Sequence, residues 1–339
     1  MNDGRERRRR RDEPVRVAVV GVGGMGSSHA RVYSGLKGAE LVAVVDTDAA
    51  RAAEVASLYG CRAVGSVDDV IDEIDAASIT VPSGLHADIG CVLLDRGVAC
   101  LVEKPLATTE EGGRALIESA RRSRTPLLVG HIERFNPAVA QLRQVLSDGQ
   151  EVLGVEARRM SAVSGRVTDI DVVTDLMVHD LDIVLDLVRS EVVDVSARGV
   201  MRGGRPGDDF VTALLTFATG TLAVLTASRV TQNTIRQLQV TTDRRFFTVD
   251  YANQELLIYR QGRIGSLGDQ PDPGSLYVLD VGTERVFIRR TEPLVVELTH
   301  FLSVCKRQVP PRVTGEEALG ALELVWEIRR QVEGARVRG

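Results

Sequence analysis

One lysine stands out among the side chains that could move a proton. Lys104 belongs to Glu103-Lys104-Pro105, which follows an apolar stretch at residues 99–102. The chain has 42 lysines and arginines together, and its only lysines are Lys37, Lys104 and Lys306. A lysine removed from water can give up its proton, whereas an arginine stays charged. The choice of lysine at position 104 therefore indicates titration or compact geometry rather than surface charge, and we predict that Lys104 is catalytic.

A second group of reactive side chains falls on a predicted helix at residues 172–188. Asp175, His179, Asp182 and Asp186 are spaced four, three and four residues apart, so they share one stripe of that helix. The rest of the helix is nearly all apolar, and the stripe must therefore face partners or a wet cleft. A carboxylate beside an imidazole is an acid–base arrangement, so we predict Asp175 and His179 to be catalytic. Asp182 and Asp186 are expected to face solvent.

A glycine-rich loop precedes both groups. Gly21, Gly23 and Gly26 form the pattern G-x-G-x-x-G after an apolar strand at residues 15–20, and Asp46 follows 20 residues after Gly26. This context predicts a dinucleotide-binding turn that holds a pyrophosphate at a helix start, rather than a turn without a ligand. A carboxylate at position 46 accepts hydrogen bonds from the ribose hydroxyls and repels a 2′-phosphate, which favours NAD over NADP.

The elements that must position these residues alternate between apolar strands and helices. We expect strands at residues 15–20, 41–45, 76–81, 99–102 and 127–130, with helices between them. This alternation predicts an α/β fold with a doubly wound parallel sheet, in which the strand ends carrying the motifs meet at one edge. His86 starts one of the helices, where it either touches the nicotinamide half of the cofactor or caps the turn.

The pattern changes after residue 132. We expect a strand at 155–163, hairpins at 211–227 and 236–251, a loop at 262–274, and closing helices at 294–307 and 316–332. Long neighbouring strands with short turns predict an α+β domain with a large, mostly antiparallel open sheet. The predicted organisation is a disordered basic tail at residues 1–14, a Rossmann domain at 15–132, and a substrate-binding and oligomerisation domain at 133–339.

Composition excludes several classes of function. The 339-residue chain has a net charge of -5 and 4% aromatic residues, which disfavours a nucleic-acid binder. No apolar stretch is long enough to predict a membrane span, and none follows the basic tail as in a secretory signal. The four cysteines form no C-x-x-C motif, no cluster has zinc-ligand spacing, and no metal site is predicted. We expect a cytoplasmic protein.

Several motifs together resemble a known family. They are Gly21-Val-Gly-Gly-Met-Gly26, Val45-Asp46, Val81-Pro82 with His86, Glu103-Lys-Pro105 and Asp175-x-x-x-His179. In combination they resemble the Gfo/Idh/MocA oxidoreductases, the group of glucose–fructose oxidoreductase and inositol dehydrogenase. Residues 129–137 and 171–182 resemble the branch that contains UDP-N-acetylglucosamine 3-dehydrogenases. The resemblance implies oxidation of a sugar ring hydroxyl to a ketone, at C3 of a UDP-N-acetylhexosamine, with hydride passing to NAD.

The resemblance also implies roles for individual residues. The catalytic group would be Lys104, Asp175 and His179, although the sequence leaves open whether Lys104 or His179 takes the proton. The cofactor-binding residues would be Gly21, Gly23, Gly24, Met25, Gly26, Asp46, Thr47, Pro82, His86 and Glu103. The substrate-binding residues would be Lys104, Arg134, Asn136, Arg166, Asp175 and His179. Alternatives are a polyol or other sugar substrate, a ketoreductase, or a non-catalytic NAD-binding sensor, which would not need both Lys104 and His179.

One predicted hairpin bears on assembly. Leu215 and Phe217 point to one face of its strand and Leu214 points to the other. If one face packs on the domain's own helices, the second apolar face needs a cover that another subunit can supply. We therefore expect a homodimer or homotetramer, with a small sugar or nucleotide sugar as the other partner.

Overall fold

The computed structural model describes residues 13–162, 171–201, 207–260, 264–265, 278–279 and 282–336. The chain forms two compact units, one of Met1–Ile132 with Glu292–Gly320 and one of Glu133–Thr291 with Ala321–Gly339. The predicted domain boundary after residue 132 coincides with the division between Ile132 and Glu133. The predicted basic tail, apart from its last two residues, and most of the predicted loop at 262–274 lie outside the described residues.

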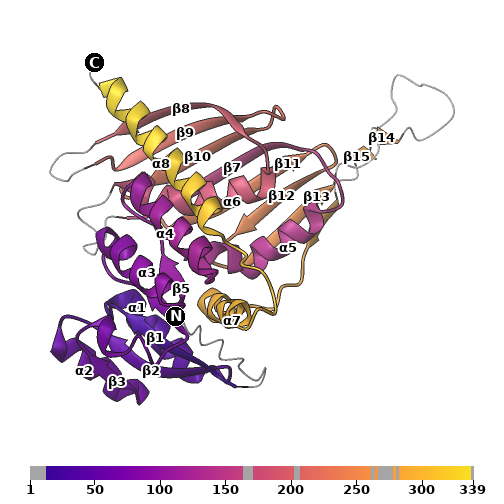
Figure 1. Cartoon of the computed structure of the whole chain (residues 1–339). Coiled ribbons are helices and arrows are strands. Elements are labelled where there is room, and N and C mark those ends of the chain that lie inside the picture. Colours follow the sequence, from indigo (N-terminus) through magenta and orange to yellow (C-terminus); the bar gives the residue numbers. More distant parts are fainter. Residues whose placement is uncertain are drawn as a thin grey trace, which may run out of the picture. The chain divides into compact units, whose positions relative to one another are not determined.

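The first unit contains a six-stranded sheet (Figure 1). Its elements are β1 Val15–Val20, α1 Gly24–Gly35, β2 Ala39–Val45, α2 Ala49–Tyr59, β3 Arg62–Val64, the short helix η1 Val67–Asp69, β4 Ala76–Ile79, η2 Ser83–Leu85, α3 His86–Asp95, β5 Ala99–Glu103, α4 Glu110–Ser123, β6 Leu127–Gly130 and α7 Pro293–Cys305. η3, Ile132–Phe135, begins at the boundary between Ile132 and Glu133. The helix α8, Gly315–Arg336, spans the boundary between Gly320 and Ala321.

All neighbouring strands of this sheet are parallel, in the order β3-β2-β1-β4-β5-β6. Every residue of β4 and β5 is buried, as expected for strands covered on both faces. The order reverses direction between β1 and β4, and ligands of such sheets bind at the carboxyl ends of the strands near this switch point. The doubly wound sheet predicted from the sequence is confirmed.

The second unit is built on an eight-stranded sheet. Its elements are α5 Pro137–Leu146, β7 Val152–Met160, the π-helix η4 Val173–Met177, α6 Val178–Val188, β8 Val192–Val200, β9 Phe210–Phe217, β10 Leu222–Ser228, β11 Ile235–Thr242, β12 Arg245–Asp250, β13 Glu255–Arg260, β14 Ile264–Gly265, β15 Val278–Leu279 and β16 Gly282–Arg285. The order is β16-β13-β12-β11-β7-β10-β9-β8, and β14 pairs with β15 separately. Within the described part of the eight-stranded sheet, only β7 and β10 pair in parallel, so the mostly antiparallel sheet is confirmed.

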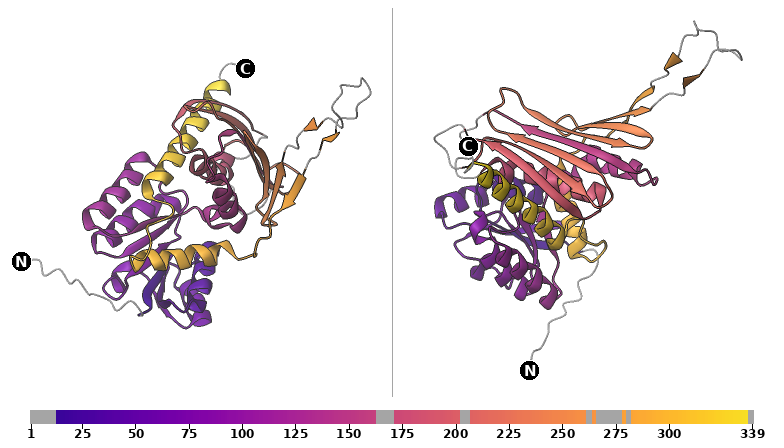
Figure 2. Two further views of the ribbon diagram at one scale, coloured as in Figure 1. Left: turned by 90° about the vertical axis from the view of Figure 1, so that its right-hand side faces the viewer. Right: turned by 90° about the horizontal axis from the view of Figure 1, so that it is seen from above.

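One face of the large sheet carries the core of this unit. Residues of α5, α6 and the later part of α8 pack on the inward-facing side chains of the strands. Figure 2 shows these helices along a single face. The strands alternate accordingly: Leu215 and Phe217 are buried, whereas Leu214 is 38% exposed on the other face. The expected two-faced hairpin is therefore present, with β9 and β10 antiparallel.

The placement of α7 differs from the expectation. The predicted second domain included this helix, but Glu292–Gly320 belongs to the first unit. Leu294, Leu298 and Phe301 of α7 join the same apolar core as Val17 and Tyr33. An apolar helix face shows that a helix is buried but not against which core it packs, so periodicity alone could not assign α7. Among the described residues, no helix is long and apolar enough to cross a membrane.

Candidate active site

The glycine loop follows β1 at the carboxyl edge of the parallel sheet. Gly21 has φ +85°, and a Cβ there would lie 2.8 Å from Val81. A Cβ on Gly26 would lie 1.8 Å from the carbonyl oxygen of Gly21, whereas one on Gly23 would meet nothing within 4 Å. Gly21 thus permits the tight turn and Gly26 permits close packing of helix on strand. The backbone at Gly23 stays open to a ligand.

The start of α1 fits the pyrophosphate of a dinucleotide. Gly23 is the N-cap residue and supplies no side-chain hydrogen bond. The N–H groups of the first helical turn are therefore available to an anion, which the helix dipole also favours. Gly24 and Met25 are exposed beside this turn. Open space over the loop, together with an uncapped helix start, is the geometry that NAD requires of these residues.

Asp46 follows β2 at the same edge. One oxygen, Oδ2, accepts a hydrogen bond from the N–H of Val22 at 2.8 Å, and the other, Oδ1, accepts from the N–H of Asp48 at 2.9 Å. Asp46 therefore fixes the shape of the glycine loop while lying where a ribose would bind. The structure also brings Arg51 to it, with Nη1 3.6 Å from Oδ2. The sequence placed Arg51 five residues away but gave no sign of this contact. Thr47 is exposed.

His86 is buried between two loops of the sheet edge. Its Nδ1 lies 2.9 Å from the carbonyl oxygen of Pro105, and its Nε2 lies 3.0 Å from that of Val81. Pro82, next to Val81, is exposed. Of the two alternatives left by the sequence, this placement favours a structural one. His86 ties the segment after β4 to the segment after β5, and so helps to position residue 104.

Glu103 and Lys104 lie where β5 ends. The carboxylate of Glu103 contacts Nε2 of His29 at 3.2 Å, and its Oε2 accepts a hydrogen bond from the backbone N–H of Lys104, also at 3.2 Å. A Cβ on Gly130 would lie 3.0 Å from that carboxylate, so only glycine leaves room for it. Glu103 is buried and Lys104 is half-buried. No sequence motif predicted the contact between His29 and Glu103.

Asp175 and His179 lie in the second unit at a change of helical geometry. The helix predicted over 172–188 is present, but η4 forms a π-turn around Asp175 before α6 begins. Asp171 starts this segment and accepts hydrogen bonds from the N–H groups of Val173 and Thr174 at 2.9 and 3.0 Å. Asp175 and His179 are both half-buried. π-turns occur frequently at functional sites, which accords with the prediction for this pair.

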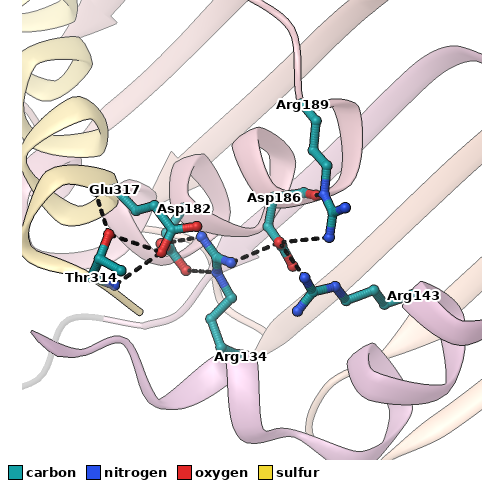
Figure 3. A network of polar contacts seen from close by, with 7 residues as sticks. All are labelled: Arg134, Arg143, Asp182, Asp186, Arg189, Thr314 and Glu317. Atoms are coloured by element: carbon teal, nitrogen blue, oxygen red, sulfur yellow. Dashed lines mark hydrogen bonds and ion pairs between the residues drawn. The ribbon is translucent and has the colours of Figure 1, made fainter. Parts of the chain in front are cut away.

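The expectation that Asp182 and Asp186 face solvent is wrong, because Arg134 covers both (Figure 3). Arg134 donates from Nε and Nη2 to the two oxygens of Asp182 at 2.6 and 2.9 Å. Its Nη1 lies 2.9 Å from Asp186 Oδ1. The carboxylate stripe is thus divided: its C-terminal half is buried under an arginine, and Asp175 with His179 remains half-buried. Arg134 is 4% exposed, which argues for a positioning role rather than contact with substrate.

A second buried arginine holds α6 from another side. Arg159 on β7 donates from Nε and Nη2 to Asp180 at 2.8 and 3.0 Å. Its Nη1 donates to Glu133 at 2.9 Å, and its guanidinium lies 5.0 Å from the ring centre of Tyr251. Burial raises the pKa of Asp180 above its ordinary value, and the charge of Arg159 opposes this. An arginine at an inward position of a strand was the signal in the sequence that could have revealed this network.

Two further predicted substrate residues have different outcomes. Asn136 is buried and caps α5, accepting from the N–H of Ala138 at 3.1 Å and donating to the carbonyl oxygen of Tyr251 at 3.0 Å. This placement gives Asn136 a structural role. Arg166 lies outside the described residues. In the part of the chain that the structure describes, no group of three or more His, Cys, Asp or Glu side chains could hold a metal ion.

Comparison with known proteins identifies related chains over both units. A family model described as an oxidoreductase family with an NAD-binding Rossmann fold matches residues 15–131, and a Gfo/Idh/MocA C-terminal domain model matches residues 161–247. UDP-N-acetylglucosamine 3-dehydrogenase of Acidithiobacillus ferrooxidans is 37% identical over 94% of this chain and 97% of its own length. An inositol 2-dehydrogenase of Corynebacterium glutamicum is 33% identical over 54% of this chain and 57% of its own.

Solved structures agree with these matches. The A. ferrooxidans enzyme, GnnA, superimposes with a TM-score of 0.85 at 35% identity, over 94% of this chain and 98% of that one. Levoglucosan dehydrogenase in complex with NADH and levoglucosan has a TM-score of 0.81 over 95% of this chain and 98% of its own, but at 18% identity it shows the fold alone. The chain therefore belongs to the Gfo/Idh/MocA family of NAD-binding oxidoreductases.

Proposed function

We propose that this enzyme oxidises the C3 hydroxyl of a UDP-N-acetylhexosamine to a ketone and passes the hydride to NAD. The observation that carries the substrate class is the extent of similarity. The likeness to the A. ferrooxidans UDP-N-acetylglucosamine 3-dehydrogenase covers 94% of the chain, whereas that to the C. glutamicum inositol dehydrogenase covers 54%. The similarity to the first relative therefore extends beyond the first unit into the second.

Residues of the first unit would hold the cofactor by its two ends. The open backbone at Gly23 and the first turn of α1 would take the pyrophosphate, and Asp46 would accept hydrogen bonds from the adenosine ribose. Glu103, fixed by His29, would lie beside the other end of the dinucleotide. When bound, the nicotinamide supplies the hydride acceptor.

Acid–base chemistry is assigned to Lys104 and to the pair Asp175 and His179. A lysine kept from water can hold a hydroxyl by a hydrogen bond and accept or relay its proton. An imidazole next to a carboxylate can take that proton, with the carboxylate stabilising the resulting charge. The size of the activity loss in a Lys104 or a His179 variant depends on which of the two groups is the base. Non-additive losses in the double variant would show that Lys104 and His179 act as one unit.

The buried arginines would keep His179 in place. Arg134 binds the helix through Asp182 and Asp186, and Arg159 binds it through Asp180. Residues 180 and 182 project from α6 about 200° apart, so the two guanidinium groups bind the helix on different sides. Rotation of α6 would break charged hydrogen bonds on both sides. The direction of the His179 side chain is fixed by the same contacts.

We also propose a homo-oligomer and a cytoplasmic location. Leu214, Leu222 and Val224 are exposed on the face of the eight-stranded sheet opposite its helices. An apolar face of this kind is a suitable surface for a second copy of the sheet. The four cysteines of the chain are free, which supports a reducing compartment.

The substrate assignment is tested by a panel of compounds offered with NAD. UDP-N-acetylglucosamine, UDP-N-acetylgalactosamine, myo-inositol and free hexoses would each be mixed with enzyme, and the absorbance of the reduced nicotinamide followed. We expect the highest kcat/KM with a UDP-N-acetylhexosamine and a 3-keto product by mass spectrometry. A clear preference for myo-inositol would overturn the proposal and favour the polyol dehydrogenase.

A further inference from the structure

A carboxyl group that the proposed reaction does not use lies buried in the first unit. Glu297 on α7 is 0% exposed, and neither of its carboxyl oxygens has a hydrogen-bond partner among the described residues. Its neighbours Leu294, Leu298 and Phe301 are core residues. Such surroundings disfavour an ionised carboxylate. Burial raises the pKa of Glu297 well above its ordinary value, and the nearby charge of Glu103 raises it further.

Glu103 connects this buried group to the proposed active site: it shares a face of β5 with Leu101, which lies in the same apolar core as Leu294 and Leu298 of α7. Its carboxylate contacts His29 and accepts the backbone N–H of Lys104. The space around it is restricted, because a Cβ on Gly130 would lie only 3.0 Å from its carboxylate. Glu103 therefore cannot move without disturbing the end of β5. A second negative charge nearby would act directly on these contacts.

Tyr33 interacts electrostatically with Glu297, and other titratable groups of α1 and α7 lie around that tyrosine. His29 and Tyr33 lie on α1, and the Tyr33 hydroxyl pairs with Ser78 at 2.9 Å. Cys305 lies two turns further along α7 and, like Glu297, interacts electrostatically with Tyr33. Burial raises the pKa of Tyr33, so the tyrosine stays neutral where Glu297 loses its proton.

We propose that Glu297 is a positioning residue that acts on the active site through Glu103. As a neutral acid it leaves Glu103 free to bind His29 and the Lys104 backbone. When Glu297 loses its proton as the pH rises, its negative charge repels the carboxylate of Glu103, and Glu103 is displaced from those contacts. This inference rests on the proposed role of Glu103 beside the cofactor.

The test compares cofactor binding in wild type and Glu297→Gln, which preserves the neutral shape at every pH. NAD affinity would be measured by titration calorimetry at a series of pH values from neutral upward, because the pKa of Glu297 is raised. In wild type we expect Kd to rise at least about fivefold, the lower end of typical coupling between linked groups. In Glu297→Gln it should change less than about twofold over the same range.

A matched control is Glu292→Gln, which removes an exposed carboxylate at the start of the same helix, where it pairs with Arg31. It should follow wild type. An equal rise in wild type and Glu297→Gln, or a flat wild-type profile, would overturn the proposal. If Glu297→Gln does not fold, Glu297→Met provides an uncharged side chain of similar volume for the same comparison. Because the readout is NAD binding without substrate, a wrong substrate assignment would not affect the result.

Discussion

Replacing Arg134 with methionine separates a positioning role from a substrate-binding role. The change keeps most of the side-chain length and removes the guanidinium that binds Asp182 through two hydrogen bonds and pairs with Asp186. The side chains of Arg134 and Asp182 are 2% and 1% exposed, so water cannot replace the lost partner. Asp182 would lose the buried guanidinium that neutralises its charge.

The loss of stability in Arg134→Met depends on which carboxylate loses its partners. Asp186 keeps Arg143 and Arg189 at 3.4 and 3.7 Å, and these arginines are 40% and 61% exposed. The loss therefore falls mainly on Asp182. Removing one partner of a buried ion pair costs about 3–5 kcal/mol. For a unit of this size, each kcal/mol lowers Tm by roughly 2–4 °C, so we expect a decrease of about 6–20 °C.

Calorimetric unfolding of Arg134→Met, Asp182→Leu and the double variant provides the assay. The double variant should recover much of the stability lost in Arg134→Met, because the buried charge that lost the Arg134 guanidinium is then absent. NAD affinity should stay near that of wild type in all three, since the glycine loop belongs to the other unit. The reasoning is refuted if Arg134→Met unfolds within a degree or two of wild type while KM for the nucleotide sugar rises more than about tenfold. Arg134 would then be a substrate ligand.

Two further predictions concern the cofactor and the assembly. The enzyme should bind NAD at least about tenfold more tightly than NADP, as roughly 1.4 kcal/mol of repulsion by Asp46 would give. Asp46→Ala should narrow the difference between the NAD and NADP affinities. Adding Arg51→Ala should widen that difference again, because it removes the guanidinium that the 2′-phosphate would meet. Equal NAD and NADP affinities in a titration of wild type would contradict the prediction. Light scattering should find an oligomer in wild type and smaller species in Leu214→Glu or Val224→Glu. Each variant places a charge on the exposed apolar face of the sheet. A wild-type monomer at micromolar concentration would refute the proposed assembly.

Local motifs were the most predictable part of the site. The glycine loop, Asp46 and Lys104 each follow a buried strand, and parallel strands bring their carboxyl ends to one edge. Knowing the strand boundaries was therefore enough to place these residues at that edge. Successive side chains of a strand point to opposite faces, and this period predicts the alternation on β9, where Leu214 and Leu215 face opposite sides.

Contacts between distant segments were not predictable in this way. Helical spacing showed that Asp182 and Asp186 share a face, but what covers that face is Arg134, 48 residues before Asp182. Carboxylates are rarely buried unless paired, so solvent was the default expectation for both. The π-turn at Asp175 was also missed, because the spacing argument assumed a regular α-helix throughout.

The central claim is that Lys104 takes part in the chemistry, and the most direct measurement is turnover of Lys104→Arg and Lys104→Met with UDP-N-acetylglucosamine and NAD. Both variants should lose about two orders of magnitude or more in kcat, the usual scale for an acid–base group. Both should bind NAD nearly as tightly as wild type, because the glycine loop and Asp46 hold the far end of the cofactor. His179→Ala should show a similar loss, far from additive with Lys104→Met if the two side chains act as one unit. Nearly full activity in Lys104→Arg would contradict the account.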